Sequence, residues 1–277
     1  MRFCSRMSND QRFTGLAGHY SLGRPGYANE AIDYICGLTQ VGVAASSVVD
    51  VGAGAGKLTG QLAGRFAQVW AVEPNADMLA VLTVAAKDWG SVHVVAGTAE
   101  ATTLPTGCAD LIVAGQAFHW FDPAEFRAEC TRLGGPDVPV AIVYNTPGPG
   151  NLHEELAWWR PAHAAPRWDD RVQAIRDFFE GYVVAAEFPH PLHYDHDAYL
   201  ANMMSHSTTP RPDDPAYSRY LASVEAIFEG YCVDGVMTVS NTTVVYSSSR
   251  GEVRSLDVHR KMEGDEDRLS QRSDDGA

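Results

Sequence analysis

Residues 49–57 read VDVGAGAGK, and this short stretch decides the fold. Val49 and Val51 are apolar and β-branched, Asp50 lies between them, and three alternating glycines follow. An apolar strand that opens into a glycine-rich turn is typical of a nucleotide-binding α/β protein, because glycine lets the backbone approach a ligand closely. Three nucleotide-binding designs begin in this way, so the neighbouring sequence has to decide between them.

Two positions exclude a phosphate-binding P-loop. Its pattern G-x-x-x-x-G-K-[ST] is matched by Gly56 and Lys57, but Leu58 replaces the hydroxyl residue and Val51 replaces the first glycine. The dinucleotide fingerprint G-x-G-x-x-G also fits poorly, because the glycines alternate and Lys57 stands where the third one belongs. We therefore expect Lys57 to be the first surface residue of a helix.

The surrounding sequence alternates between two kinds of apolar pattern from about residue 28 to residue 145. Helical spacing is found at 28–38, 56–66, 75–88 and 122–133, and short apolar runs at 46–51, 67–73, 91–95, 109–115 and 138–144. Asn75 and Asp122, with Pro123 behind it, are expected helix caps. Fully apolar strands that alternate with helices predict an α/β, Rossmann-like, doubly wound sheet that is mostly parallel.

The regular alternation ends after residue 144. A Pro/Gly-rich hinge at 145–151 leads into residues 151–231, which are predicted to be mainly helical and carry many aromatic side chains. Residues 235–250 predict two short strands around a turn at Ser240 and Asn241. Residues 251–277 are charged and lack periodicity, so we expect a disordered tail.

Composition narrows the class of protein. The chain has 277 residues, with 35 Asp and Glu against 21 Lys and Arg, a net charge of −14 that argues against nucleic-acid binding. Five scattered cysteines favour reduced thiols, and no apolar run suggests a signal peptide or membrane helix. We expect a cytoplasmic protein, a monomer or homodimer, that acts on a small molecule without a nucleic-acid or membrane partner.

Several motifs in order carry a family resemblance over most of residues 12–250. They are RFTGLAGHYSLGRPGY (12–27), VVDVGAGAGKLTGQLA (48–63), AVEPNADML (71–79), GTAEATTLP (97–105), DLIVAGQAFHWFD (110–122), MSHSTTPRPDD (204–214) and NTTVVYSSSR (241–250). The chain resembles class I S-adenosylmethionine (SAM)-dependent methyltransferases, of the small-molecule group similar to trans-aconitate methyltransferases (methyltransferase type 11). The resemblance implies a seven-stranded sheet over residues 1–250, with 151–231 as a helical lid on the substrate.

The resemblance implies SAM as the cofactor, with its methionine half on the glycine loop. The backbone of Gly52, Ala53 and Gly54 would pass close to this half of SAM. Asp50 would orient the amino end of SAM, and Gln116 would line the same side.

The ribose and adenine would lie beside the next two strands. Glu73, followed by Pro74, would hold the ribose hydroxyls, and Met78 would pack on the adenine. The backbone amides of Ala99 and Glu100 would read the adenine edge; Thr98 replaces the more common Asp there, so side-chain recognition of the adenine amino group is not expected.

The methyl-transfer site would follow the fourth strand. His119 is either a general base or a residue that only shapes the pocket, and Trp120 and Trp158 are candidate substrate contacts. Tyr20 and Arg24 could close over the cofactor, with Tyr20 near the reaction and Arg24 binding the carboxylate of SAM or of an acidic substrate.

Other functions remain open at this point. The three histidines of HPLHYDH (190–196) lack a familiar metal spacing, so no metal site is expected. The resemblance predicts O- or C-methylation of a small molecule, aromatic or carboxylate-bearing. An NAD-dependent oxidoreductase on a similar sheet and a SAM-binding protein without catalysis are the alternatives.

Overall fold

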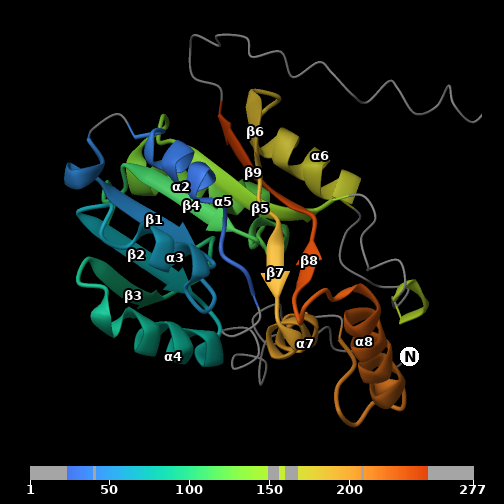
Figure 1. Ribbon diagram of the computed structural model, residues 1–277. Helices are drawn as coiled ribbons and strands as arrows, with labels where there is room; N and C mark the ends of the chain where they lie inside the picture. The colour runs from blue at the N-terminus through green and yellow to red at the C-terminus, as the bar shows by residue number, and fades with distance from the viewer. Residues whose placement is uncertain (1–23, 40–41, 149–155, 160–167, 207–208, 249–277) are drawn as a thin grey trace, which may run out of the picture.

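A computed structural model describes residues 24–39, 42–148, 156–159, 168–206 and 209–248. The predicted tail at 251–277 and Tyr20 therefore lie outside the described residues. The main body is a seven-stranded sheet of order β3-β2-β1-β4-β5-β9-β6, with a separate two-stranded sheet, β7-β8, beside it (Figure 1).

Five strands of the main sheet pair in parallel, and β9 is inserted in the opposite direction between β5 and β6. The parallel strands are β1 (Ser47–Val51), β2 (Gln68–Glu73), β3 (Val92–Ala96), β4 (Leu111–Gly115) and β5 (Val140–Pro147). β9 (Asn241–Ser248) runs antiparallel to both of its neighbours, β5 and β6 (Val183–Pro189). The α/β class and the mostly parallel, seven-stranded sheet that we predicted are confirmed.

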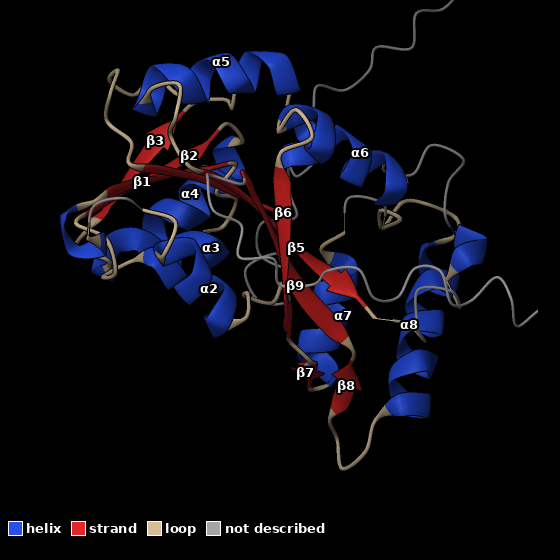
Figure 2. Cartoon of the chain, turned by 90° about the horizontal axis from the view of Figure 1, so that it is seen from above, coloured by secondary structure: helices blue, strands red, loops and turns tan. Residues whose placement is uncertain are grey.

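Helices cover both faces of this sheet. They are α2 (Asn29–Cys36), α3 (Lys57–Leu62), α4 (Ala76–Ala85), α5 (Pro123–Gly134) and α6 (Trp168–Phe178). Figure 2 shows α5 and α6 on one face and α2, α3 and α4 on the other. The predicted caps are present: the side chain of Asn75 accepts from the amides of Asp77 and Met78, and Asp122 caps α5 with Pro123 at its start.

Each face of the sheet has its own apolar core. Val49 and Ile112 pack with Phe126 under α5, whereas Val48 packs with Ile32 on the opposite side. Consecutive residues of a strand point to opposite faces, so both sets must be apolar when both faces are covered. This explains why the strands have continuous apolar sequences rather than an alternating pattern.

The segment that we predicted to be a helical lid also contains strands. Residues 151–231 contain α6, α7 (His196–Met204) and α8 (Tyr217–Tyr231), but also β6 and β7 (Leu192–Tyr194). β6 is an edge strand of the main sheet, and α6 contributes Phe178 to the main core. The remaining elements, α7 and α8 with the β7-β8 (Met237–Val239) pair, have their own buried cluster around Tyr199, Met203 and Phe228, and we refer to this unit as the lid.

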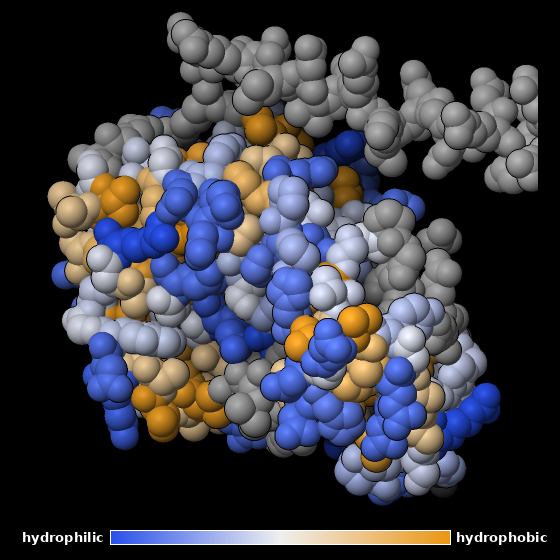
Figure 3. Space-filling view, in the orientation of Figure 1, coloured by the Kyte–Doolittle hydropathy of each residue, from blue (hydrophilic) through white to orange (hydrophobic). Residues whose placement is uncertain are grey.

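The two strands predicted around Ser240 are both present. They are β8 and β9, but they enter different sheets, so this turn links the lid to the main body. Figure 3 shows an apolar surface over α4, where Val84 is exposed. No helix within the described residues combines the length and apolar character needed to cross a bilayer.

Candidate active site

The glycine loop begins where β1 ends, at the carboxyl edge of the sheet. Gly52, Gly54 and Gly56 have φ values of +71°, +58° and +87°, in the left-handed region that favours glycine. A Cβ added to Gly52 would lie 2.6 Å from the Cβ of Ala117, so glycine is required there for close packing as well. Backbone hydrogen bonds connect the loop to β2, because the amides of Gly52 and Ala53 both donate to the carbonyl oxygen of Val72.

Glu73 ends β2 beside this loop and fixes its shape. One carboxylate oxygen accepts from the Gly54 amide and the other from the Asn75 amide, both at 2.8 Å. Burial raises the pKa of Glu73, and the two amide hydrogen bonds oppose that rise. A carboxylate has about four acceptor positions, so Glu73 retains capacity for the hydroxyl groups of a ligand.

Asp50 is buried below the loop with one oxygen unsatisfied. Its Oδ2 accepts from the Thr59 hydroxyl at 2.6 Å, whereas Oδ1 has no hydrogen-bond partner within the described part of the chain. Burial raises the pKa of Asp50 to about 7, with a further contribution from Glu73. A buried oxygen without a donor is costly, and a donor from a bound ligand would remove that cost.

The predicted adenine residues lie along one side of the loop. Met78 is buried against Ala55, Ala99 is buried, and Pro74 is exposed. The side chain of Glu100 accepts from the Asp122 amide at 2.9 Å, which ties the 97–104 loop to the start of α5.

An ion pair that we did not predict, between the buried Glu129 and the partly exposed Arg132, supports the same 97–104 loop. Glu129 accepts hydrogen bonds from both the amide and the hydroxyl of Thr102, and from Arg132 Nε at 2.7 Å. Arg132 also donates to the carbonyl oxygen of Leu104 at 2.8 Å. Arg132 and the bonds from Thr102 lower the pKa of Glu129 to about 2, so it stays ionised. In the sequence both residues look like surface charges on a helix, one turn apart.

His119 lies in the turn Phe118–Trp120 that follows β4. Its Nδ1 is 3.2 Å from the Tyr144 hydroxyl, and its ring is stacked at an angle on Trp120. Burial, together with the charges of Arg171 and Arg24, lowers the pKa of His119 to about 3. The imidazole is therefore neutral near pH 7 and a weak proton acceptor.

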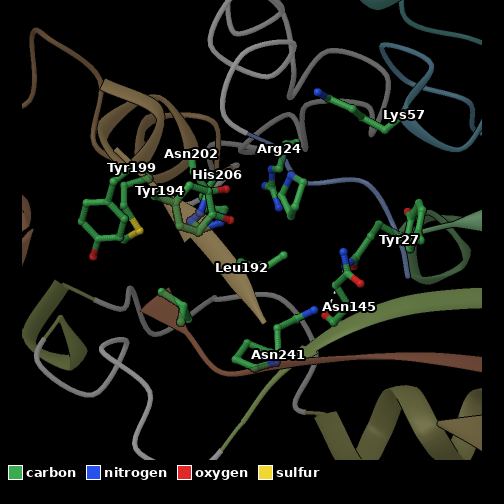
Figure 4. Close-up of a pocket in the computed structure, with 15 residues that line it drawn as sticks. Arg24, Tyr27, Lys57, Asn145, Leu192, Tyr194, Tyr199, Asn202, His206 and Asn241 are labelled. Atoms are coloured by element: carbon green, nitrogen blue, oxygen red, sulfur yellow. Dashed lines mark hydrogen bonds between the residues drawn. The ribbon is translucent and has the colours of Figure 1, made fainter. Parts of the chain in front are cut away.

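A pocket of about 110 Å³, with both polar and apolar lining residues, lies between the carboxyl edge of the sheet and the lid (Figure 4). The sheet side is formed by Arg24, Pro25, Tyr27, Lys57, Gln116, Asn145, Pro147 and Asn241. The lid side is formed by residues of β7, α7 and β8, with His206 after α7. Gln116 has a left-handed φ of +56°, an unusual conformation for a side chain other than Gly or Asn.

The structure corrects the expected position of Lys57. It begins α3 as predicted, but it lines the pocket instead of pointing into solvent, and partial burial lowers its pKa. Sequence reasoning placed it on the surface because an amphipathic pattern cannot show what lies beyond the end of a helix. The position of Lys57 directly after the glycine loop was the sequence feature that could have indicated its location at the pocket.

Residues 24–28 form one edge of the pocket and are tied down at four points. Arg24 Nε donates to the Ser205 hydroxyl at 2.8 Å, at the end of α7. Asn145 donates to the carbonyl oxygen of Gly26, and the amide of Ala28 donates to the Thr243 hydroxyl. Tyr27 exchanges two backbone hydrogen bonds with the side chain of Gln61 on α3.

These bonds fix Arg24 at the pocket. The Tyr20 part of the predicted gate is outside the described residues.

Other predicted residues lie elsewhere. Trp158 does not line the pocket: it is 40% exposed and packs under the guanidinium of Arg219, at 3.9 Å. The imidazoles of His193 and His196 have separate partners, the Thr238 hydroxyl and the Asp197 carboxylate. The backbone amide of His190 donates to the carbonyl oxygen of Asn241 in β9. The described residues contain no cluster of three or more His, Cys, Asp or Glu side chains suited to a metal ion.

Comparison with known proteins defines the class. Residues 49–142, from β1 into β5, match the family described as methyltransferase domain. The predicted resemblance to methyltransferases is thus confirmed for this part of the chain.

Its relatives are methyltransferases by name. An uncharacterized methyltransferase of Mycobacterium tuberculosis is 38% identical over 157 residues, which cover 57% of this chain and 59% of the relative. An uncharacterized methyltransferase of Schizosaccharomyces pombe is 32% identical over 127 residues, 46% of this chain and 49% of the relative. The chain thus matches only about half to three fifths of the length of these relatives.

A solved structure is similar over a larger part of the chain. A putative type II methyltransferase from Anaeromyxobacter dehalogenans superposes with a TM-score of 0.60, covering 82% of this chain and 97% of that one, at 21% identity. At this identity the likeness shows a shared fold.

Proposed function

We propose that this protein transfers the methyl group of SAM to a small-molecule acceptor, as an O- or C-methyltransferase. The observation that carries the proposal is the pairing of Glu73 with the glycine loop. Its carboxylate is buried, held by the amides of Gly54 and Asn75, and positioned at the end of β2, where a carboxylate can accept from two ribose hydroxyls.

The residues at the loop suit the remainder of SAM. The backbone of Gly52 and Gly54 would carry the methionine half, Asp50 would accept from its amino group through the unsatisfied Oδ1, and Ala99 would lie beside the adenine. SAM supplies an electrophilic methyl group whose bond to sulfur breaks with both electrons staying on sulfur, while the acceptor atom forms the new bond.

Such a displacement depends on alignment and on exclusion of water more than on acid–base chemistry. His119 fits this requirement as a neutral, half-buried side chain whose Nδ1 lies 3.2 Å from the Tyr144 hydroxyl. With a pKa of about 3 it would remove a proton from an acceptor poorly. We therefore assign His119 a positioning role and expect an acceptor that is already nucleophilic at neutral pH.

Calorimetry with SAM, S-adenosylhomocysteine and NAD tests the proposal. We expect binding of the first two and loss of that binding in Glu73→Ala. Glu229→Ala, which removes the same side chain from the exposed face of α8, is the matched control and should bind normally. Tight NAD binding without SAM binding would contradict the proposal and indicate an oxidoreductase.

Turnover separates an enzyme from a SAM-binding protein without catalysis. A metabolite extract incubated with methyl-labelled SAM should yield a labelled small molecule with the wild-type protein. SAM binding without transfer to any small molecule would contradict the catalytic part of the proposal.

A further inference from the structure

We propose that Tyr194 and Asn202 of the lid select the acceptor, by holding a hydroxyl or carbonyl oxygen of a molecule whose remaining surface is apolar. This inference rests on the proposed function, because it assigns the acceptor side of the same site.

The polar side chains on the sheet side of the pocket are engaged within the protein. Gln116 donates to the carbonyl oxygen of Asn145 at 3.2 Å, and the side chain of Asn145 donates to the carbonyl oxygen of Gly26 at 2.8 Å. Asn241 donates to the carbonyl oxygen of His190 at 3.2 Å. Each of these amides thus uses a donor to hold the wall of the pocket together.

The hydroxyl of Tyr194 has no such role. The side chain is 6% exposed, yet its hydroxyl makes no hydrogen bond within the part of the chain that the structure describes. Its place in β7 and an edge-on contact with the ring of Tyr199, at 6.1 Å between centroids, fix its position. Burial raises the pKa of Tyr194 to about 12, so the hydroxyl stays protonated and keeps a donor for a ligand. A buried donor without a partner is costly, and an oxygen atom of a ligand would remove that cost.

Asn202 offers a second polar group to the same pocket. It lies in α7, and its backbone carbonyl oxygen accepts from the Ser205 hydroxyl, whereas its side-chain amide has no hydrogen-bond partner among the described residues. Figure 4 shows Tyr194 and Asn202 on the lid side of the pocket, away from Lys57 and Tyr27. An amide both donates and accepts, so Asn202 and Tyr194 together can bind a hydroxyl as well as a carbonyl group.

The neighbouring side chains of the lid suit an apolar surface. Leu192, Met203 and Val239 line this side, and no Asp or Glu is among the described residues that line the pocket. An acceptor with an apolar body would lose its water shell against these side chains, and its oxygen would meet Tyr194 and Asn202. A site of this kind rejects an analogue that lacks the oxygen, because its own buried polar groups then stay unpaired.

The two polar groups also suit a site without a strong base. A hydrogen bond that is donated to an ionised oxygen favours the ionised form. Tyr194 and Asn202 would thereby help an acidic hydroxyl or an enol to release its proton to water and become a nucleophile. This is consistent with the pKa of His119, which burial lowers to about 3.

Three probes that differ in their polar group test this inference. The full chain is saturated with S-adenosylhomocysteine and titrated with 4-methylphenol, acetophenone and p-xylene, followed by ligand-observed NMR. p-Xylene has the shape of 4-methylphenol, with a methyl group in place of the hydroxyl. We expect one or both oxygenated probes to bind at least about fivefold more tightly than p-xylene. The tighter of the two shows whether the site is built for a hydroxyl or a carbonyl group.

Conservative variants locate the oxygen of the probe. Tyr194→Phe removes only the hydroxyl and should weaken the binding of the preferred oxygenated probe about 5- to 30-fold, while p-xylene binds as before. Asn202→Leu, which keeps a side chain of similar size, should have the same kind of effect. Tyr182→Phe removes a hydroxyl from a side chain that is 69% exposed, and Asn29→Leu changes an exposed residue of α2. Both of these controls should bind every probe like the wild-type protein.

The outcomes distinguish this inference from the proposed function. Failure of S-adenosylhomocysteine to bind the wild-type protein would contradict the proposed function. If it binds, the inference is wrong when neither oxygenated probe binds, when p-xylene equals both of them, or when Tyr194→Phe and Asn202→Leu leave the preferred probe unaffected. If Tyr194→Phe lowers the affinity for S-adenosylhomocysteine and spares the oxygenated probes, Tyr194 belongs to the SAM site instead. If Asn202→Leu does not fold, the wild-type titration and Tyr194→Phe decide the inference.

Discussion

Replacing Gly52 with alanine tests the packing of the glycine loop. The φ of +71° costs an L-residue about 1–2 kcal/mol. The new Cβ would also lie 2.6 Å from the Cβ of Ala117 and 3.2 Å from the ring of Phe121, and such overpacking costs about 1–3 kcal/mol. We therefore expect Gly52→Ala to lower the free energy of unfolding by about 2–5 kcal/mol.

Gly107 provides the control for this variant. Its φ is +74°, but a Cβ there would have no atom within 4 Å, so Gly107→Ala should cost only the backbone part, about 1–2 kcal/mol. Urea denaturation of both variants and the wild-type protein, followed by tryptophan fluorescence, gives the difference. Adding Ala117→Gly to Gly52→Ala should recover part of the loss. Equal destabilisation at the two positions, or no recovery, would refute the steric argument.

Three further predictions concern buried ionisable groups, each measured as the free energy of unfolding against pH. Folding lowers the pKa of Glu129 from 4.5 to about 2, so its contribution to stability is present above pH 4.5 and lost as the pH falls toward 2. Glu129→Gln should abolish this pH-dependent loss and destabilise the protein at pH 7 by about 1.5–3 kcal/mol. An unchanged pH profile would contradict the ion-pair argument. Folding raises the pKa of Asp50 from 3.8 to about 7, so its ionisation lowers the stability of the protein as the pH rises through this range. Asp50→Asn should reduce this decline in stability. A decline of the same slope in the variant would show that Asp50 does not cause it. Folding lowers the pKa of His119 from 6.5 to about 3, so the stability of the protein is lost as the pH falls through this window. NMR should find the imidazole of His119 neutral at pH 5. A titration near pH 6.5 would contradict both the burial of His119 and its assigned role.

The sequence predicted the main sheet well, because its signals are local. The strands were recognisable as apolar runs and the helices by their spacing, and Asn75 and Asp122 carried the caps in their own side chains. The glycine loop could be recognised because its three glycines lie within five positions of the sequence. Each of these features depends on residues within a few positions of one another.

The pocket could not be predicted in the same way, because it is built from distant segments. Arg24 contacts Ser205, 181 positions away, and Thr243 binds the side chain of Asn145, 98 positions away. In the sequence Asn145 begins a predicted Pro/Gly hinge, and no local pattern shows that its side chain donates a hydrogen bond to the carbonyl oxygen of Gly26. β6 was missed because its short apolar run lies within a segment dominated by helical spacing.

The pocket is formed partly by the main sheet and partly by the lid, and this division has an evolutionary consequence. The methyltransferase match ends at residue 142, whereas the lid side of the pocket comes from residues 192–206 and from Val239. Substitutions, insertions or exchange of the lid can therefore alter which compound is admitted while the glycine loop and Glu73 stay intact. Under the proposed function, new specificities would arise in the part of the chain that has its own core, while the residues proposed to bind SAM remain unchanged.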